Sequence, residues 1–207
     1  MASTIDIANL ALSHLGDDAT VASIDPPEGS AQAEHCARFY PSSLASMLEM
    51  HNWRFCLRRI ALAAVTNPSA TWAYAYAVPS DMLAAVTVLD PNNTDDYQAL
   101  NERASQDYDM ETTTAGDVVL LTNQADAVLR YKVLVTDTAK FPPLFVEALS
   151  WLLASKLAGP LLKGDSGRKA ALDCTKAFAM WWGKAVASDA SQRQVTTEQT
   201  ASWVAAR

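Results

Sequence analysis

The chain contains few residues of the kinds that form disulfides or bind metals. Its 207 residues include 3 cysteines and 3 histidines, and no two cysteines form a CxxC pair. A disulfide framework needs paired cysteines, and a structural zinc site needs closely spaced Cys and His ligands. We therefore predict that Cys36, Cys56 and Cys174 are reduced core residues in a cytoplasmic setting. We expect no metal site and no cofactor.

Glycine and basic residues are also scarce. The 7 glycines form neither a GxGxxG nor a GxxxxGK(S/T) motif, so neither kind of phosphate-binding loop is present. The 16 Lys and Arg residues are outnumbered by 23 Asp and Glu residues, which gives a formal net charge of −7. Because proteins that grip the phosphate backbone are normally basic, this balance disfavours general binding of nucleic acids.

No segment has the pattern of an export signal or of a membrane span. The N-terminal residues have no Lys or Arg before their apolar positions, and Asp6 interrupts them, so we expect no signal peptide. The longest apolar stretch, residues 144–162, contains Glu147, Lys156 and a Gly-Pro pair. We predict a core helix there and no contact with a membrane.

Hydrophobic residues make up 50% of the chain, which is enough for a folded core. In both terminal thirds they recur at helical spacing. The predicted helices are residues 3–15, 31–52, 144–157 and 167–187. We expect Pro41 to break or kink the second helix, because proline removes a backbone donor. We expect the Gly-Pro pair at 159–160 to end the third.

The middle third has strand patterns instead, with alternation at period two and turn residues between the runs. The predicted strands are residues 72–79, 84–89, 97–100, 118–121 and 127–135. The predicted class is α+β, a helical bundle built from both ends of the chain with a small, mainly antiparallel β region inserted between them. The expected divisions are a bundle of residues 1–53 and 141–187, a β region of 54–140, and an extended tail of 188–207.

Residues 164–167 spell GDSG, the nucleophile motif of trypsin-like serine proteases, and His35 in the sequence AEHC resembles their histidine motif. That chemistry needs a base within hydrogen-bond reach of the serine hydroxyl, and an oxyanion hole. Here His35 falls in a predicted helix, Ser166 falls between two helices, and the chain has too little strand for a double β-barrel. We interpret GDSG as a helix-to-helix turn with Asp165 or Ser166 as the cap.

Paired carboxylates leave one enzymatic alternative open. The pairs are Asp17 with Asp18, Asp95 with Asp96, and Asp107 with Asp109. Glycoside hydrolysis needs two carboxylates that face each other across a cleft. Adjacent acidic residues in loops are usually solvated turn formers. A non-enzymatic protein is therefore our prediction, and a glycan hydrolase is the alternative.

The aromatic residues are typical of a binding surface. Trp72, Tyr74 and Tyr76 alternate, so they would share one face of a strand. Trp181 and Trp182 are about 100° apart on a helix, so both cannot point into one core. Exposed Tyr and Trp side chains often anchor interfaces. The predicted interface residues are Trp72, Tyr74, Tyr76, Trp182, Trp203 and Val204. Burial in the core is the alternative for the strand aromatics and Trp181.

Several landmarks occur in one order along the chain. They are IANLALSHLG at 7–16, Ile24-Asp25, residues 33–38, Tyr40-Pro41, HNWRF at 51–55, YAVPSD at 76–81, residues 128–131 and FPPLFVEAL at 141–149. In this order and spacing the chain resembles the tail tubular protein A family, the head-to-tail adaptor or connector proteins of short-tailed phages. The resemblance covers about residues 5–190 and is weakest between 90 and 127.

The resemblance implies a structural virion protein that is assembled in the host cytoplasm. Its partners would be further copies of itself in a ring of twelve, the portal protein and the tail nozzle protein. DNA would pass through the lumen without specific binding, and an acidic lining would repel it. The alternatives within this setting are a virion-associated glycan hydrolase and a small DNA-packaging or regulatory protein. The net charge argues against the last of these.

Two surfaces follow as hypotheses. The tail of residues 188–207 would reach the portal with Trp203 and Val204 as anchors, because an isolated aromatic stands there in a polar segment. The β region of residues 72–135 would face the nozzle or the neighbouring subunit.

Overall fold

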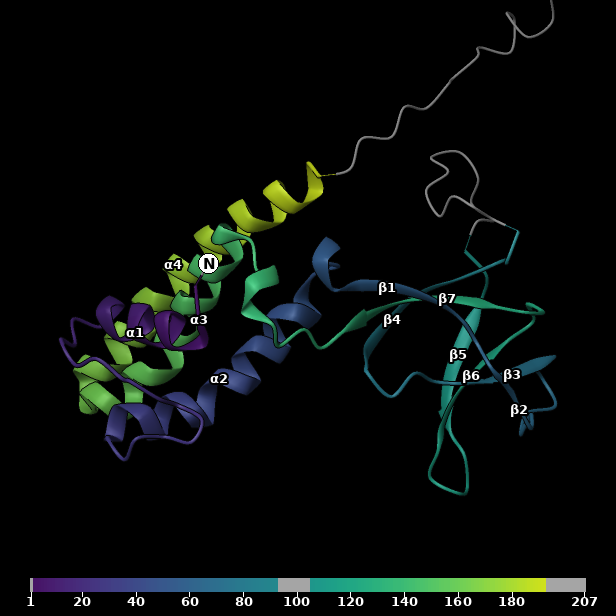
Figure 1. Ribbon diagram of the computed structural model, residues 1–207, viewed down its shortest axis with the longest axis horizontal. Helices are drawn as coiled ribbons and strands as arrows, with labels where there is room; N and C mark the ends of the chain where they lie inside the picture. Colours follow the sequence, from purple (N-terminus) through teal and green to yellow (C-terminus); the bar gives the residue numbers. More distant parts are fainter. Residues whose placement is uncertain (1, 93–104, 193–207) are drawn as a thin grey trace, which may run out of the picture. The chain divides into compact units, whose positions relative to one another are not determined.

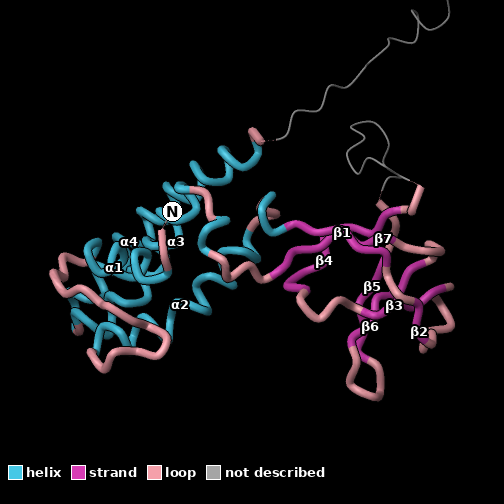
Figure 2. Tube along the Cα trace, viewed as in Figure 1, coloured by secondary structure: helices cyan, strands magenta, loops and turns pink. Residues whose placement is uncertain are grey.

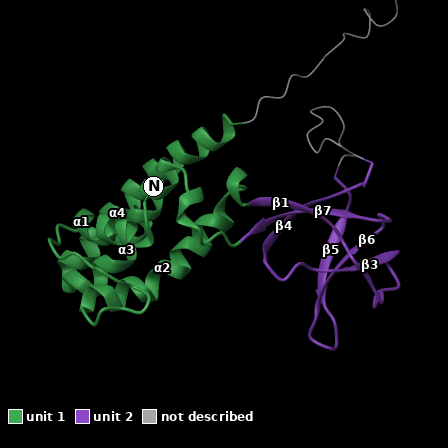
Figure 3. Ribbon diagram, in the orientation of Figure 1, with its two compact units in different colours: residues 1–56, 134–192 green, residues 57–133, 193–207 purple. Residues whose placement is uncertain are grey.

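The computed structural model describes residues 2–92 and 105–192. It divides into two compact units, a helical unit of residues 1–56 and 134–192 and a β unit of residues 57–133 (Figure 3). Figure 2 shows the α-helices in the first and the strands in the second. The predicted α+β class, with a bundle from both ends of the chain and antiparallel strands from the middle, is confirmed. The predicted strand at 97–100 and most of the tail lie outside the described residues.

The helical unit is built around one central helix (Figure 1). Its helices are α1 (Thr4–His14), α2 (Ala31–Met50), α3 (Pro143–Leu162) and α4 (Gly164–Ala190), with short 3-10 helices at Arg54–Cys56 and Thr138–Lys140. Helix α3 contacts each of the other three. By length and composition it is apolar enough to cross a membrane. A helix that is surrounded by other helices on most sides must also be apolar on most of its faces. The packing of α3 against three helices therefore accounts for the same apolar composition.

The ends of α1 form as the sequence predicts. Ser3 and Asp6 form a reciprocal capping box, in which each side chain accepts the other residue's backbone N–H at 3.1 and 2.7 Å. Gly16 follows the helix with a φ of +73°. Of the predicted break or kink in the next helix, the break is wrong, because α2 is continuous through Pro41. Pro41 is exposed, and the helix loses only the hydrogen bond to the carbonyl of Ala37.

The junction of α3 and α4 is tighter than the sequence predicts. Helix α3 continues through Gly159 and Pro160, because a proline in the last turn removes one hydrogen bond while packing against α4 continues. Only Lys163 separates the helices, and Gly164 follows with a φ of +54°. Lys163 is the N-cap of α4 and makes no side-chain cap, so the predicted cap at Asp165 or Ser166 is wrong.

The β unit contains two antiparallel sheets. Its strands are β1 (Leu57–Ala61), β2 (Ala64–Val65), β3 (Tyr74–Ala77), β4 (Met82–Leu89), β5 (Tyr108–Thr112), β6 (Val118–Thr122) and β7 (Val128–Val133). One sheet has the order β1-β7-β4 and the other β2-β3-β6-β5. Strands β1, β2 and β5 were not predicted. All three lie at sheet edges, where most of their side chains are exposed and the apolar alternation is lost.

Aromatic rings and one buried carboxylate fix the end of α2 in the helical unit. Trp53 is buried, donates its indole N–H to the carbonyl of Met47 at 2.7 Å, and lies edge-on to Phe145 at 5.0 Å. Asp189 of α4 is also buried. It accepts the backbone N–H of Arg54 at 3.0 Å and lies 3.3 Å from the ring of His51. The end of α4 is therefore held beside the end of α2.

Candidate functional site

Tyr74 and Tyr76 lie on one face of β3, as predicted. Their rings are 6.4 Å apart. Tyr74 is 41% exposed, whereas Tyr76 is buried and donates its hydroxyl to the carbonyl of Gln124 at 2.9 Å. Val118 of β6 belongs to the same face and is 46% exposed. Tyr74 and Val118 therefore offer apolar surface. Tyr76 instead joins β3 to the loop that follows β6.

Trp72 does not share that face, so this part of the prediction is wrong. It lies two residues before β3, outside the strand, where Asn67 donates to its carbonyl at 2.6 Å. The indole packs against a small cluster on the opposite face of the sheet, which consists of Ala75, Val119 and Leu121. Alternation at period two holds only inside a strand, and here the strand begins after Trp72.

The outer side of helix α4 carries exposed apolar side chains interspersed with charged ones, and the exposed Lys176 lies one helical turn from both Leu172 and Met180. Leu172 and Met180 are 59% and 53% exposed, and with Ala179 they lie at helical spacing on one side. We call these three residues the α4 face. The neighbouring Trp181 is half-buried beneath Lys184, whose Nζ lies 4.1 Å from the ring centroid. Trp182 is half-buried too, and its indole nitrogen is buried without a hydrogen-bond partner in the described part of the chain.

The last two predicted interface residues, Trp203 and Val204, lie outside the described residues. The predicted extended tail begins too early at residue 188, because α4 continues to Ala190.

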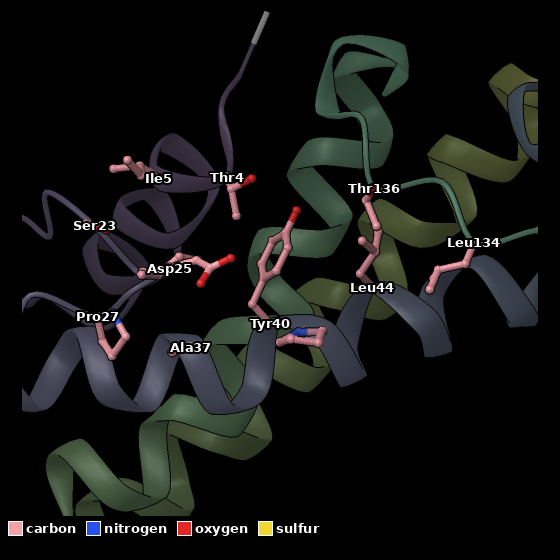
Figure 4. Close-up of a pocket in the computed structure, with 12 residues that line it drawn as sticks. Thr4, Ile5, Ser23, Asp25, Pro27, Ala37, Tyr40, Leu44, Leu134 and Thr136 are labelled. Carbon is pink, nitrogen blue, oxygen red and sulfur yellow. The ribbon is translucent and has the colours of Figure 1, made fainter.

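A cavity within the helical unit surrounds Tyr40. Figure 4 shows the Tyr40 ring rising from α2, with its hydroxyl directed between Thr4 and Thr136. The cavity has a volume of about 640 Å³. Its lining consists of Thr4, Ile5, Ser23, Ile24, Asp25, Pro27, Ala37, Tyr40, Pro41, Leu44, Leu134 and Thr136. It was not predicted, because its walls come from four segments that are separated in sequence.

Tyr40 itself is 7% exposed, and among the described residues its hydroxyl has no partner within hydrogen-bond geometry. Burial raises the pKa of Tyr40 above its ordinary value, and the nearby hydroxyl of Thr4 opposes that rise. A neutral phenol has one donor and one acceptor, and the Thr4 hydroxyl is the group in the lining that interacts with it.

A second unpredicted cluster joins α1 to α3. The His14 ring stacks on Trp151 with centroids 3.6 Å apart and planes 8° apart, and its Nε2 lies 3.0 Å from the hydroxyl of Ser150. Ser150 donates its own proton to the carbonyl of Glu147 at 2.7 Å, so Nε2 of His14 is the donor to Ser150. Burial lowers the pKa of His14, and the Glu147 carboxylate opposes this.

This Ser-His-Glu set resembles catalytic groups by residue type only. Ser150 is fully buried and its proton is engaged by the backbone, so its oxygen is not presented to a substrate. The cluster joins two helices whose residues lie 136 positions apart in sequence, and no local pattern would have predicted it.

The GDSG motif is the first turn of α4, directly after the junction residue Lys163, so the interpretation of the motif as a turn between the two helices is wrong. The Ser166 hydroxyl lies 3.1 Å from the carbonyl oxygen of Lys163, and the exposed Asp165 pairs with Arg168 at 3.0 Å. Gly167 is buried against the backbone of α3, where an added Cβ would lie 2.9 Å from the carbonyl oxygen of Ala158.

In the described ranges no group of three or more His, Cys, Asp and Glu side chains lies close enough to hold a metal ion. The three cysteines are buried outside any disulfide, and burial raises the pKa of the Cys36 thiol to about 11. Of the acidic pairs, Asp17 accepts the backbone N–H of Ala19 at 2.9 Å in a turn. Asp95 and Asp96 lie outside the described residues.

Comparison with protein-family models found no match for this chain. A search of curated proteins found no similar sequence either.

Proposed function

We propose that this chain is a subunit of a head-to-tail adaptor ring, which joins a phage portal to the tail nozzle and surrounds the DNA exit channel. The support from sequence is the order of landmarks between residues 5 and 190. The support from the fold is that large apolar side chains are exposed on its surface, where other protein subunits could bind. The protein acts by assembling with other subunits and catalyses no reaction.

The observation that carries the proposal is the number of large apolar side chains on the surface of both units. They are Met50, Ile60, Val65, Tyr74, Val118, Leu134, Leu162, Leu172 and Met180, each at least 39% exposed. Single exposed apolar side chains are common on folded proteins and only contiguous apolar surface marks a contact by itself, so these residues are candidate contacts whose role rests on the order of landmarks in the sequence. A closed ring needs two different contact surfaces on each subunit, one for each neighbour.

The α4 face is our candidate for one side of the ring contact. Full burial of a Leu or Met side chain stabilises by about 1.5–3 kcal/mol, and about half of each side chain is already covered. Burial of Leu172 and Met180 would therefore contribute about 1 kcal/mol each at every subunit boundary. Because each boundary repeats around a ring, such modest contacts suffice once the portal gathers the subunits.

The remaining surfaces are assigned to the other partners. Tyr74 and Val118 of the β unit face the nozzle or the neighbouring subunit, and the tail reaches the portal through Trp203 and Val204. The acidic balance of the chain, with a formal net charge of −7, favours passage of DNA over its retention.

The test of the ring contact is a double substitution, Leu172→Asp with Met180→Asp, in the purified full chain mixed with the portal protein of the same genome. The matched control places the same charges off this face, at the exposed positions Thr20 and Ser42. We expect the double variant to stay folded by circular dichroism and to lose ring assembly, whereas the control assembles. Normal rings from the double variant would remove the α4 face from the contact, and no ring from the unaltered chain would refute the function.

The tail assignment has its own test. A chain that ends at residue 192, which keeps Asp189 and the whole of α4, should lose most of its capture by immobilised portal, because the anchors Trp203 and Val204 are removed. Undiminished capture would show that the portal binds another surface.

A further inference from the structure

The β unit has four sheet edges, formed by β1 and β4 in one sheet and by β2 and β5 in the other. Two of these edges are poorly suited to pairing with a further strand. Strand β2 has only two residues, and β4 has two register shifts and a bridge to Gln106. Strands β1 and β5 have five residues each, pair in regular register, and each have one neighbour among the described strands. We call the unpaired sides of β1 and β5 the open edges.

The backbone groups that β1 presents at its open edge follow from its pairing with β7. Leu62 continues that register and donates its N–H to the carbonyl of Ala127 at 3.0 Å. Hydrogen-bonded and non-hydrogen-bonded pairs alternate along an antiparallel ladder. The N–H and C=O groups of Leu57, Arg59 and Ala61 are therefore directed away from β7.

The same alternation gives the outward groups of β5. Thr113 continues the register with β6 and donates its N–H to the carbonyl of Asp117 at 2.8 Å. The residues whose backbone groups are directed away from β6 are therefore Tyr108, Met110 and Thr112. The carboxylate of Asp109 accepts the N–H of Met110 at 2.8 Å, which agrees with a position outside the ladder.

The two open edges carry opposite charges. Arg58 and Arg59 are exposed on β1, and residues 54–65 contain no acidic residue. Asp109 and Glu111 are exposed on β5, and residues 105–117 contain no Lys or Arg. Arg58 also pairs with Asp81 at 2.7 Å, and both side chains stay about half exposed, at 55% and 45%. Pairing of either edge with its own kind would bring like charges together, whereas β1 against β5 brings opposite charges together.

We propose that the open edge of β1 in one copy of this chain pairs antiparallel with the open edge of β5 in the next copy. The two strands are equal in length, so one register pairs all five residues of each. The pairs whose outward backbone groups meet in it are Leu57 with Thr112, Arg59 with Met110, and Ala61 with Tyr108.

This register also brings the opposite charges together. Arg58 lies opposite Glu111 and diagonal to Asp109, and a long side chain reaches both positions. Asp109 exchanges the N–H of Met110 for Arg58, and that N–H then bonds the carbonyl of Arg59. The carboxylate that covers the open edge in the single chain is thus replaced by a strand.

The contact uses two different surfaces of each copy, so it is heterologous and repeats from one copy to the next. Such a contact builds a ring if its rotation closes and a filament if it does not. It would act in addition to the α4 face. The inference deepens the proposed function, and it rests on that function for the closure of the copies into a ring.

Cross-linking between copies of the full chain, mixed with the portal protein of the same genome, tests the register. One chain carries Ala61→Cys. The other carries Tyr108→Cys and an affinity tag, so that mixed and same-chain dimers separate on a non-reducing gel. Directly opposed residues of a hydrogen-bonded pair have Cα atoms about 5.5 Å apart, which suits a disulfide. The control replaces Tyr108→Cys by Thr114→Cys, at an exposed position between β5 and β6. The native cysteines are buried.

We expect the mixed Ala61–Tyr108 disulfide to form at least tenfold faster than the control disulfide. It should also form at least tenfold faster than a disulfide between two copies of either chain. Equal rates with the control, or a dominant same-chain dimer, would overturn the proposal. This comparison changes no charged residue.

Charge reversal adds a second readout to the same cysteine pair. Arg58→Glu in the first chain, or Glu111→Arg in the second, should slow the mixed disulfide. Both reversals together should recover most of the lost rate, because the charges are then exchanged across the contact. A rate that stays slow with both reversals, in chains that are folded by circular dichroism, would overturn the register. If Arg58→Glu fails to fold, the comparison of Tyr108 with Thr114 still decides.

Negative-stain images of the same mixtures separate this inference from the proposed function. Rings on the portal with a slow mixed disulfide would overturn the pairing of β1 with β5 and leave the adaptor standing. A fast mixed disulfide without rings on the portal would support the pairing and refute the adaptor. A slow disulfide without rings would refute both.

Discussion

Gly167 lies where α4 crosses α3, and a substitution there tests the packing of the helical unit. An added Cβ would lie 2.9 Å from the carbonyl oxygen of Ala158 and 3.4 Å from the Cα of Gly159. Both neighbours are backbone atoms, which cannot rotate away as a side chain can. The two helices must therefore shift apart locally when Gly167→Ala is introduced.

The expected magnitude comes from two opposing effects. Alanine is favoured over glycine inside a helix by about 1 kcal/mol. Overpacking a closely packed site costs about 1–3 kcal/mol. Gly183 provides the matched control, because it lies in the same helix and an added Cβ meets no heavy atom within 4 Å. We expect Gly183→Ala to stabilise by about 0.5–1 kcal/mol, and Gly167→Ala to be less stable than Gly183→Ala by about 1–3 kcal/mol.

Urea unfolding followed by the helical circular dichroism signal measures this difference, because all the described α-helices belong to the helical unit. The slope of the transition should stay the same in both variants, so the midpoints report the free energy of unfolding. If Gly167→Ala were stabilised as much as Gly183→Ala, the close approach of α4 to α3 would be wrong.

Three further predictions concern the same unit. Burial lowers the pKa of His14 below 6.5, so its neutral ring stabilises the fold fully above that pH and the contribution is lost as the pH falls through the folded-state pKa. Urea midpoints measured from pH 7 to 5 should therefore fall less steeply for His14→Gln than for the unaltered chain, and equal slopes would contradict this. Because burial raises the pKa of the Cys36 thiol to about 11, native protein should react with a maleimide at Cys36 at least tenfold more slowly than urea-unfolded protein, as peptide mass spectrometry can measure. Ser3→Ala removes the hydroxyl that caps α1 and should cost about 1 kcal/mol in thermal unfolding, and an unchanged midpoint would show that the cap contributes nothing.

Local sequence signals predicted the features that depend on neighbouring residues. The Ser3–Asp6 box and Gly16 mark the two ends of α1, and the apolar spacing locates all four helices. The signals failed where tertiary contact outweighs local preference. Helix α3 runs through Gly159 and Pro160 because its packing with α4 continues beyond them. A proline near a helix end removes only one backbone hydrogen bond. That loss is too small to end a helix that packs against several other helices.

The candidate site was predicted less well than the fold. Trp72, Tyr74 and Tyr76 recur at every second position, but only the last two belong to a strand. Asn67 bonds the carbonyl of Trp72, and the indole packs on the other face of the sheet. The cavity at Tyr40 depends on segments that meet only in the folded unit. Hydrophobic periodicity and composition describe one helix or strand at a time. They therefore carry no information on contacts between segments that are distant in sequence.

The most direct measurement of the central proposal is negative-stain imaging of the purified chain, alone and mixed with the portal protein of the same genome. The account predicts rings of regular size docked coaxially on the portal, with one adaptor subunit at each repeat. A chain that forms no ring and shows no density on the portal at micromolar concentration would contradict it.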